Sequence, residues 1–292
     1  MTPSRWLEVR VRSASVPADV LVEALLELGG RAVWEEDGWQ VTHLADPGDL
    51  VEGRALKRFV EGRFTDGDGG NVQVSTRWQK QGDWSELWRR GLDARRLTDR
   101  LVVTPTWIRP DVGPGDLVIV LDPGVAFGTA EHGTTRGCLR ILDAVVRHGD
   151  RILDVGAGSG ILSIAAALMG AGAVEAVEMD QWAVDAALDN VKVNGVGDRV
   201  TVRAHRVSAD DLAHGPPRDG VIANLETGLL RPLLAGLADA VRPGGWLLLS
   251  GILAHEWPGI REEVVALGMA HDRLDEDGEW CSGLFRRPPV PS

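Results

Sequence analysis

The chain has 292 residues, of which 44% are hydrophobic and 25% are charged, and it carries a formal net charge of −12. This composition is typical of a folded globular protein, and the length predicts one large domain with a smaller companion. The acidic balance disfavours direct nucleic-acid binding, because such binding requires lysine and arginine at the phosphates. A basic partner fits this charge more easily.

Two cysteines, Cys138 and Cys281, lie far apart and lack the spacing of a zinc site or of a disulfide framework, so no metal is expected. The first residues contain no long apolar segment, and no run reaches the roughly 18 apolar residues of a membrane span. These features predict a cytoplasmic protein that is neither exported nor embedded in a membrane. The sequence carries no signal for assembly, and a monomer is favoured.

Residues 1–78 are predicted to form a small ferredoxin-like α+β domain. Alternating apolar and polar residues indicate its strands, and apolar residues at helical spacing indicate its helices. Together they make the split β-α-β unit of that fold. The predicted elements are a strand at 6–12, a helix at 17–28, two short strands separated by Asp37-Gly38, a helix at 49–64 and a strand at 72–77.

The next segment, residues 79–97, is predicted to be a linker helix. Trp84, Leu87 and Trp88 recur at helical spacing, so one face of the helix can pack while the neighbouring arginines remain solvated. Packing between domains is favoured over a role in substrate binding, because an apolar stripe on a helix usually packs.

Residues 98–292 alternate strand-like and helical runs, which predicts an open, parallel, doubly wound sheet of the Rossmann-like α/β class. The end of the chain differs, because a predicted helix at 254–267 is followed by two short runs, at 272–274 and 280–286, that can form a closing hairpin. The predicted strands of the sheet are 151–155, 173–178, 200–205, 220–224 and 246–250.

The main chemical signal is the glycine-rich turn Asp154-Val-Gly156-Ala-Gly158-Ser-Gly160, which joins a predicted strand to a predicted helix. An open α/β sheet binds nucleotide-like ligands at such a turn. A dinucleotide fingerprint starting at Gly156 requires a glycine at position 161, which is Ile161 here. Asp154 would repel a pyrophosphate but attract the ammonium and sulfonium of S-adenosylmethionine. The turn therefore favours that cofactor, and the alternative is a corner whose glycines serve packing alone.

Two later strand ends add polar side chains at the same edge of the predicted sheet. Glu178 lies 22 residues after Gly156, where an acidic residue can reach the ribose hydroxyls of a ligand. For Asp180, a ligand role and an N-cap of the next helix are equally open. Asn224 ends a further strand, and its amide can both donate and accept hydrogen bonds near the methyl group. Alone it would more often be a turn residue, but the convergence of strand ends favours a functional role.

A polar, glycine-punctuated segment at 122–135 precedes a predicted helix, and it can form either a lid over the crevice or a plain loop. Phe127 lies within this segment. Stacking on the cofactor and anchoring in the core are equally open for its ring. For His132, a hydrogen bond that fixes the loop is favoured over a role as a general base, since an isolated histidine is rarely catalytic without an orienting partner.

On these segments the chain resembles the PrmA family, the methyltransferases that modify large-subunit ribosomal protein eleven. The resemblance covers nearly the whole chain, and its most specific matches are the segment at 122–135 and the turn at 153–162. Supporting matches are the segments at 83–107, 222–225 and 277–280. The resemblance implies a class I methyltransferase form of the Rossmann-like sheet.

The resemblance also implies that Thr135, Gly156, Glu178 and Asn224 contact S-adenosylmethionine, and Thr135 is the residue that it adds to those chosen on spacing and charge. It further implies that the N-terminal domain holds the ribosomal protein substrate while the linker lets that domain reorient. Asn224 is the expected catalytic residue. The expected cofactor-binding residues are Thr135, Gly156, Glu178, Asn224, Asp154, Gly158 and Phe127.

Two positions depart from the family pattern. Ala130 stands where the family loop usually has glycine, so the loop must differ locally if that position requires a positive φ. Glu178 stands where aspartate is usual, and Asp180-Gln181 stands where the family has Asp-Pro. Cofactor binding is expected to survive, because glutamate reaches the same hydroxyls with one more methylene.

The expected reaction transfers a methyl group from S-adenosylmethionine to lysine and/or N-terminal amines of a ribosomal protein. One alternative is a methyltransferase of the same fold that acts on another protein, a nucleic acid or a small molecule. A second is an NAD-dependent oxidoreductase, which Ile161 and Asp154 disfavour. A third is a cofactor-binding module without catalysis.

Overall fold

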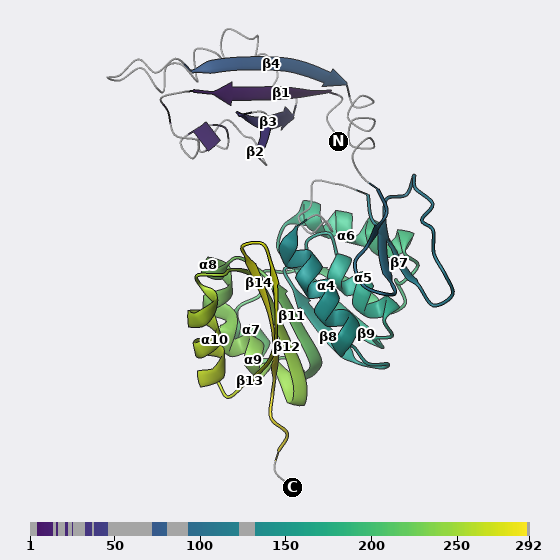
Figure 1. The fold of residues 1–292 in the computed structure, drawn as a ribbon. Helices are drawn as coiled ribbons and strands as arrows, with labels where there is room; N and C mark the ends of the chain where they lie inside the picture. Colours follow the sequence, from purple (N-terminus) through teal and green to yellow (C-terminus); the bar gives the residue numbers. More distant parts are fainter. Residues whose placement is uncertain are drawn as a thin grey trace. The chain divides into compact units, whose positions relative to one another are not determined.

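The computed structural model describes residues 5–13, 16, 21–22, 25, 33–36, 38–45, 72–80, 93–122 and 132–290. The chain divides into two compact units, Met1–Leu92 and Asp93–Ser292 (Figure 1). The predicted helix at 49–64 and most of the predicted linker helix at 79–97 lie outside the described residues. At the two ends of that linker, residues 79–80 continue a strand and residues 95–96 form another, so neither end is helical.

The first unit contains a four-stranded antiparallel sheet in the order β2-β3-β1-β4. This order is the one that a split β-α-β unit produces. Leu7, Val9 and Val11 alternate along β1 and are buried on one face, where they pack with Leu21 and Leu25. The strands are β1 (Arg5–Arg12), β2 (Val33–Glu36), β3 (Trp39–Ala45) and β4 (Gln73–Lys80).

The second unit is built on a seven-stranded sheet in the order β10-β9-β8-β11-β12-β14-β13. The first five strands in this order are parallel, and β14 runs antiparallel to both of its neighbours. The predicted doubly wound sheet and its closing hairpin are therefore confirmed. The strands are β8 (Arg151–Val155), β9 (Ala173–Glu178), β10 (Val200–Ala204), β11 (Arg218–Asn224), β12 (Val241–Leu253), β13 (Ala270–Asp277) and β14 (Trp280–Arg286).

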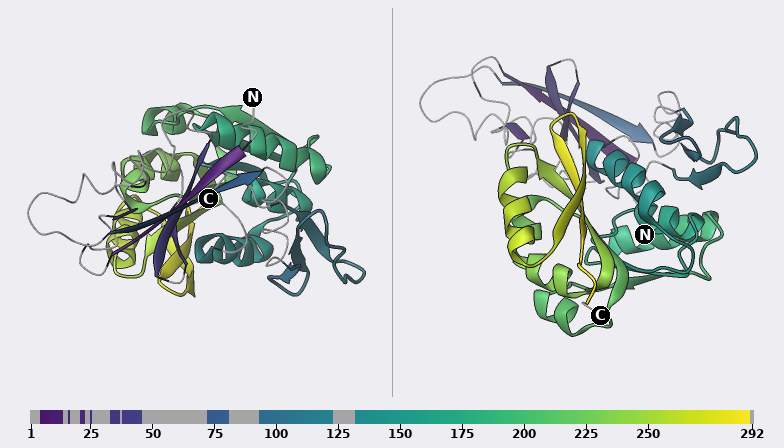
Figure 2. Two further views of the ribbon diagram at one scale, coloured as in Figure 1. Left: turned by 90° about the horizontal axis from the view of Figure 1, so that it is seen from above. Right: turned by 60° about the horizontal axis from the view of Figure 1, so that its bottom comes forward.

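Helices cover both faces of this sheet (Figures 1 and 2). Two neighbouring residues of β8 pack on opposite faces of the sheet. Ile152 packs with buried residues of the helices between 133 and 193, and Leu153 packs with those of the helices between 209 and 266. A strand buried on both faces carries apolar residues on both sides, and in β8 these are Ile152, Leu153 and Val155. The helices are α4 (Gly133–Val145), α5 (Ile161–Leu168), α6 (Gln181–Val193), α7 (Ala209–His214), α8 (Thr227–Leu230), α9 (Leu234–Asp239) and α10 (Trp257–Ala266), with a 3-10 turn at Arg231–Leu233.

A third sheet, of three short strands, precedes α4 in the chain: β5 (Arg95–Arg96), β6 (Leu101–Thr104) and β7 (Leu117–Val120). The side-chain amide of Asn194 fixes it to the end of α6. Its Oδ1 accepts from the N–H of Val120 at 2.8 Å, and its Nδ2 donates to the carbonyl of Val120 at 2.7 Å. Within the described part of the chain, no helix combines the length and apolar character needed to cross a bilayer.

Candidate active site

The chain order reverses between β8 and β11, and open α/β sheets bind their ligands at the carboxyl ends of the strands at such a point. The glycine turn after β8 lies there. Gly156, Gly158 and Gly160 have φ values of 73°, 54° and 79°, a region that other L-residues rarely adopt. A Cβ on Gly156 would lie 2.5 Å from Cδ2 of Leu225, so this glycine also allows a close approach of the next strand end.

Asp154 is the penultimate residue of β8, just before this turn, and is 1% exposed. Its Oδ2 accepts a hydrogen bond of 2.6 Å from the Ser163 hydroxyl. Its Oδ1 is buried and has no hydrogen-bond partner among the described residues. Burial raises the pKa of Asp154 to about 6, because removing water disfavours the charged carboxylate.

Glu178 ends β9, and its carboxylate faces the glycine turn. Oε2 accepts from the N–H of Gly158 at 3.0 Å, and Oε1 accepts from the N–H groups of Met179 and Asp180 at 2.8 and 3.0 Å. Asp180 is the N-cap of α6, since its side chain accepts from the N–H of Trp182 at 3.0 Å. Of the two roles open for Asp180, the structure displays the N-cap.

Asn224 ends β11, opposite Ser250 of β12. Its Oδ1 is buried without a hydrogen-bond partner in the described part of the chain. The following residue, Leu225, donates its N–H to the carbonyl of Ser250 at 3.1 Å, which holds this strand end against β12. The backbone at Asn224 is therefore held in place, and its side-chain oxygen is a buried acceptor that a ligand could satisfy.

Thr135 lies in the first turn of α4, is fully buried, and has an Oγ1 without a hydrogen-bond partner among the described residues. The carbonyl of the adjacent Thr134 accepts from the Ser250 hydroxyl at 3.3 Å, which brings this turn beside the ends of β11 and β12. His132 forms a hydrogen bond of 2.7 Å between its Nδ1 and Oγ1 of Thr134, and its ring centroid lies 4.9 Å from that of Trp280. Burial lowers the pKa of His132, so the neutral ring suits the predicted fixing role.

Of the predicted site residues, Phe127 lies outside the described residues, as does the departing position Ala130. The structure brings the others together at one edge of the sheet. Asp154, Gly156 and Gly158 come from the end of β8 and its turn, Glu178 from β9, Asn224 from β11 and Thr135 from α4.

Sequence reasoning missed the contacts that hold α4 in place. The guanidinium of Arg136 forms two hydrogen bonds to Asp277, of 2.9 and 2.5 Å, and Arg140 does the same with Asp275. The helix also packs so closely on β14 at Gly137 that a Cβ there would overlap Oγ of Ser282. The two arginines are four residues apart and the two aspartates two apart, which matches one face of a helix with one face of a strand.

The α4–hairpin ion pairs predict a pH-dependent contribution to stability. Asp277→Asn is expected to lower the free energy of unfolding by about 1–2 kcal/mol at pH 7, allowing for partial solvent screening. The hydrogen bonds from Arg136 lower the pKa of Asp277 to about 2. The contribution is therefore present above the pKa of an unfolded aspartate, about 4, and is lost as the pH falls through about 2. Urea unfolding at pH 7 and pH 3 measures it.

Asp272→Asn is the matched control, because Asp272 lies on the same strand and pairs with Arg286 where both side chains are more exposed. It is expected to change the stability by less than about 0.5 kcal/mol. A loss for Asp277→Asn that equals this control, or that is the same at both pH values, would contradict the prediction.

Three buried oxygens without partners in the described part of the chain thus meet at the carboxyl edge: Oγ1 of Thr135, Oδ1 of Asp154 and Oδ1 of Asn224. Buried polar atoms are normally hydrogen-bonded, and leaving one unpaired costs about 1–3 kcal/mol. A ligand that brings donors and a positive charge to this edge would satisfy them. The ammonium, the hydroxyls and the sulfonium of S-adenosylmethionine have this chemistry, so the residues present fit that group.

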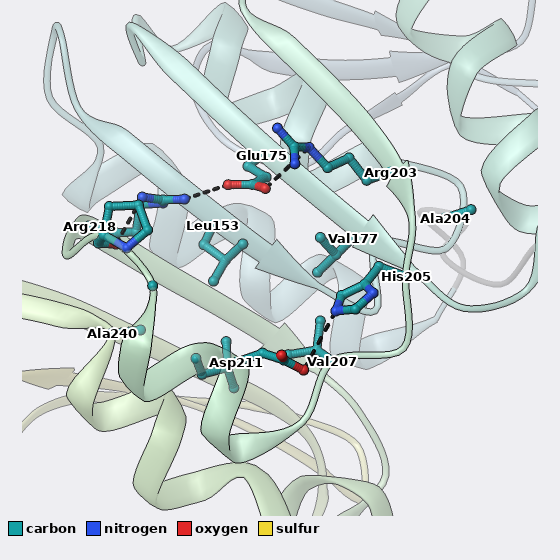
Figure 3. Close-up of a pocket in the computed structure, with 13 residues that line it drawn as sticks. Leu153, Glu175, Val177, Arg203, Ala204, His205, Val207, Asp211, Arg218 and Ala240 are labelled. Atoms are coloured by element: carbon teal, nitrogen blue, oxygen red, sulfur yellow. Dashed lines mark hydrogen bonds and ion pairs between the residues drawn. The ribbon is translucent and has the colours of Figure 1, made fainter.

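A pocket of about 570 Å³ lies apart from these residues, none of which line it (Figure 3). Leu153, Val177 and Val207 contribute apolar side chains to it. Its polar side chains are already paired, since Glu175 bonds both Arg203 and Arg218, and His205 lies 3.5 Å from Asp211. The pocket follows the face of the sheet beside α7 and is distinct from the candidate site.

The fold and the site define the class of the protein. The strand at the sixth position of the sheet, β14, is antiparallel to its neighbours. A glycine turn follows the central strand β8, and an acidic residue ends the adjacent strand β9. This combination is that of S-adenosylmethionine-dependent methyltransferases. The family model described as ribosomal protein L11 methyltransferase (PrmA) matches residues 5–288. The chain belongs to this family, which confirms the resemblance, and family and fold imply the use of S-adenosylmethionine.

Individual relatives agree with this assignment. The ribosomal protein L11 methyltransferase of Symbiobacterium thermophilum is 33% identical over 97% of this chain and 100% of its own length. That of Chloroflexus aurantiacus is 37% identical over 74% of this chain and 72% of its own. The crystal structure of ribosomal protein L11 methylase from Lactobacillus delbrueckii subsp. bulgaricus superposes with a TM-score of 0.61 at 27% identity, covering 68% of this chain and 100% of that one.

Proposed function

We propose that this chain transfers methyl groups from S-adenosylmethionine to lysine and/or N-terminal amines of ribosomal protein L11. The observation that carries the proposal is the set of buried oxygens of Thr135, Asp154 and Asn224 that lack a partner among the described residues, in a chain of the PrmA family. In this proposal residues 1–78 hold the protein substrate, residues 79–97 let that part reorient, and residues 98–292 carry out the reaction.

The proposed cofactor contacts follow from charge and position. Glu178 accepts hydrogen bonds from the ribose hydroxyls, since its carboxylate already lies against the glycine turn. Asp154 attracts the ammonium, and Thr135 bonds the amino-acid part of the cofactor through its hydroxyl. Gly156 and Gly158 let the cofactor approach the backbone. Phe127 completes the proposed set as a cover for the bound cofactor.

The proposed mechanism depends on positioning. Bound S-adenosylmethionine supplies an electrophilic methyl group on its sulfonium. Asp154 would hold the cofactor at its ammonium and Glu178 at its ribose. The site would then place the uncharged substrate amine in line with the methyl group, and the proton that the amine loses would pass to water. A free lysine has a pKa of about 10.4, so desolvation and the nearby positive charge must favour its neutral form. Asn224 and the carbonyl of Leu225 orient the amine.

Cofactor affinity is expected to depend on the ionisation of Asp154. Its carboxylate form binds the ammonium, and burial raises its pKa to about 6, so protonation competes with binding below that pH. The dissociation constant should therefore rise by up to about tenfold per pH unit as the pH falls below 6. Isothermal titration calorimetry between about pH 5 and pH 8 measures this dependence.

Asp154→Asn provides the control, because an amide does not titrate in this range. The variant should bind the cofactor more weakly at pH 8 and lack the break near pH 6. Parallel curves for the two proteins would show that Asp154 is not the titrating group.

The proposed function is tested with the full chain and methyl-labelled S-adenosylmethionine. Ribosomal protein L11, ribosomal RNA and a small-metabolite extract are incubated in separate reactions, and mass spectrometry locates the methyl groups on the protein. The proposal expects label on amines of L11. Label on RNA or metabolites alone would support the alternative substrates, and no transfer to any of them would support a module without catalysis.

A further inference from the structure

Strand β12 contains a bulge beside the candidate site. On its partner β14, Leu249 pairs with Gly283 and Ile252 pairs with Cys281, so Ser250 and Gly251 together face the single residue Ser282. Gly251 has a φ of 80°. A bulge of this kind bends the strand and re-aims the backbone next to it, and such bulges are common beside active sites.

The bulge places Gly251 against the backbone of Leu225. A Cβ on residue 251 would overlap the Leu225 oxygen, and it would lie 2.5 Å from the carbonyl carbon and 3.0 Å from the nitrogen of the same residue. All three are backbone atoms, which cannot move aside as the end of a flexible side chain can. Both the positive φ and this contact therefore require glycine at position 251.

Leu225 is held by β12 on its peptide, and its side chain lies against the glycine turn that follows β8. Its N–H donates to the carbonyl of Ser250, the first residue of the bulge, at 3.1 Å. Its Cδ2 fills the space where Gly156 would carry a Cβ, at 2.5 Å. The side-chain contact can adjust through the Leu225 rotamer, whereas the contact with Gly251 fixes the peptide itself.

We infer that Gly251 is a positioning residue for methyl transfer, because the bulge sets the Leu225 carbonyl at the angle from which it orients the substrate amine. The inference rests on the proposed function, in which the Leu225 carbonyl orients the substrate amine. In-line displacement requires close alignment, and a displacement of about 1 Å of a positioning group can reduce the rate by about 10²-fold. Gly251 touches neither substrate nor cofactor in this account.

The test compares two alanine substitutions that share the backbone strain and differ in the contact. Gly268 has a φ of 85°, and a Cβ added to it would meet no atom within 4 Å, so Gly268→Ala carries the strain alone. Gly251→Ala is expected to lower kcat for L11 methylation by about 30-fold, with KM and the Kd for S-adenosylhomocysteine within about threefold of wild type. Gly268→Ala is expected to keep kcat within about twofold, although both variants lose thermal stability.

A Gly251→Ala protein that binds S-adenosylhomocysteine and retains wild-type kcat would overturn the inference. If this variant does not fold, a backbone ester between Leu225 and Glu226 serves instead, since an ester weakens the Leu225 carbonyl as an acceptor and keeps every side chain. Its kcat should fall by about tenfold at unchanged cofactor affinity, and an unchanged kcat overturns the inference. Failure of the proposed function is distinct, because wild-type protein would then not methylate L11.

Discussion

Asn224→Ala is expected to lower kcat for L11 methylation by roughly 10²–10³-fold while the Kd for S-adenosylmethionine rises by less than about tenfold. In the proposed mechanism the Asn224 amide holds the substrate amine in line with the methyl group, so the loss of this amide should be felt mainly in the transition state. Because Oδ1 of Asn224 has no partner among the described residues, its removal breaks no internal hydrogen bond there. Single-turnover kinetics and calorimetry separate the two effects, and wild-type turnover would refute the role.

Asn194→Ala is the matched control for Asn224→Ala. The amide of Asn194 makes hydrogen bonds of 2.8 and 2.7 Å with the backbone of Val120, so its loss should lower thermal stability and leave kcat within a few-fold. The two asparagines are thus expected to behave in opposite ways, one supporting rate and the other supporting the fold. Equal losses of activity in both variants would indicate a general structural effect.

Glu178→Ala is expected to raise the Kd for S-adenosylmethionine by about 100-fold, with kcat at saturating cofactor within about threefold of wild type. The variant would remove the two charge-assisted hydrogen bonds that we propose between Glu178 and the ribose, together worth about 3 kcal/mol. It also removes the contact of the carboxylate with the N–H of Gly158, so the glycine turn loses a support. Calorimetric titration with S-adenosylmethionine and with S-adenosylhomocysteine measures the change.

Two comparisons sharpen the test of Glu178. Glu178→Asp introduces the residue that is usual in the family and should recover most of the affinity. Glu175→Ala removes a carboxylate from the same strand, but this one pairs with Arg203 and Arg218 in the separate pocket, so affinity should stay near wild type. Loss of affinity in Glu175→Ala equal to that in Glu178→Ala would contradict the assigned contact.

The sheet and its glycine turn could be predicted because their signals are local. The strand at 151–155 and the glycines at 156, 158 and 160 follow one another in the chain, and the spacing of these glycines alone excludes a dinucleotide fingerprint. The acid at Glu178 follows from a fixed distance along the chain. Polar residues at the ends of several parallel strands lie at the same edge of the sheet. Their convergence can therefore be predicted without knowing any other contact in the fold.

The supports of the site could not be predicted, because they join distant parts of the chain. Arg136 meets Asp277 across 141 residues, and a pattern of charges does not identify such a pair. The glycine at 251 is visible in the sequence, but its contact with the Leu225 backbone depends on a bulge set by β14. The limits of strands depend likewise on their partners, which is why β12 extends from Val241 to Leu253 around the predicted 246–250.

The C-terminal hairpin has a consequence for the order in which the parts of the site form. Asp275, Asp277 and Ser282 hold the start of α4, which lies some 140 residues earlier in the chain. Long-range contacts of this kind form late, after a large loop has closed. The Thr135 side of the proposed site therefore stays incomplete until β13 and β14 have been made and have packed against α4.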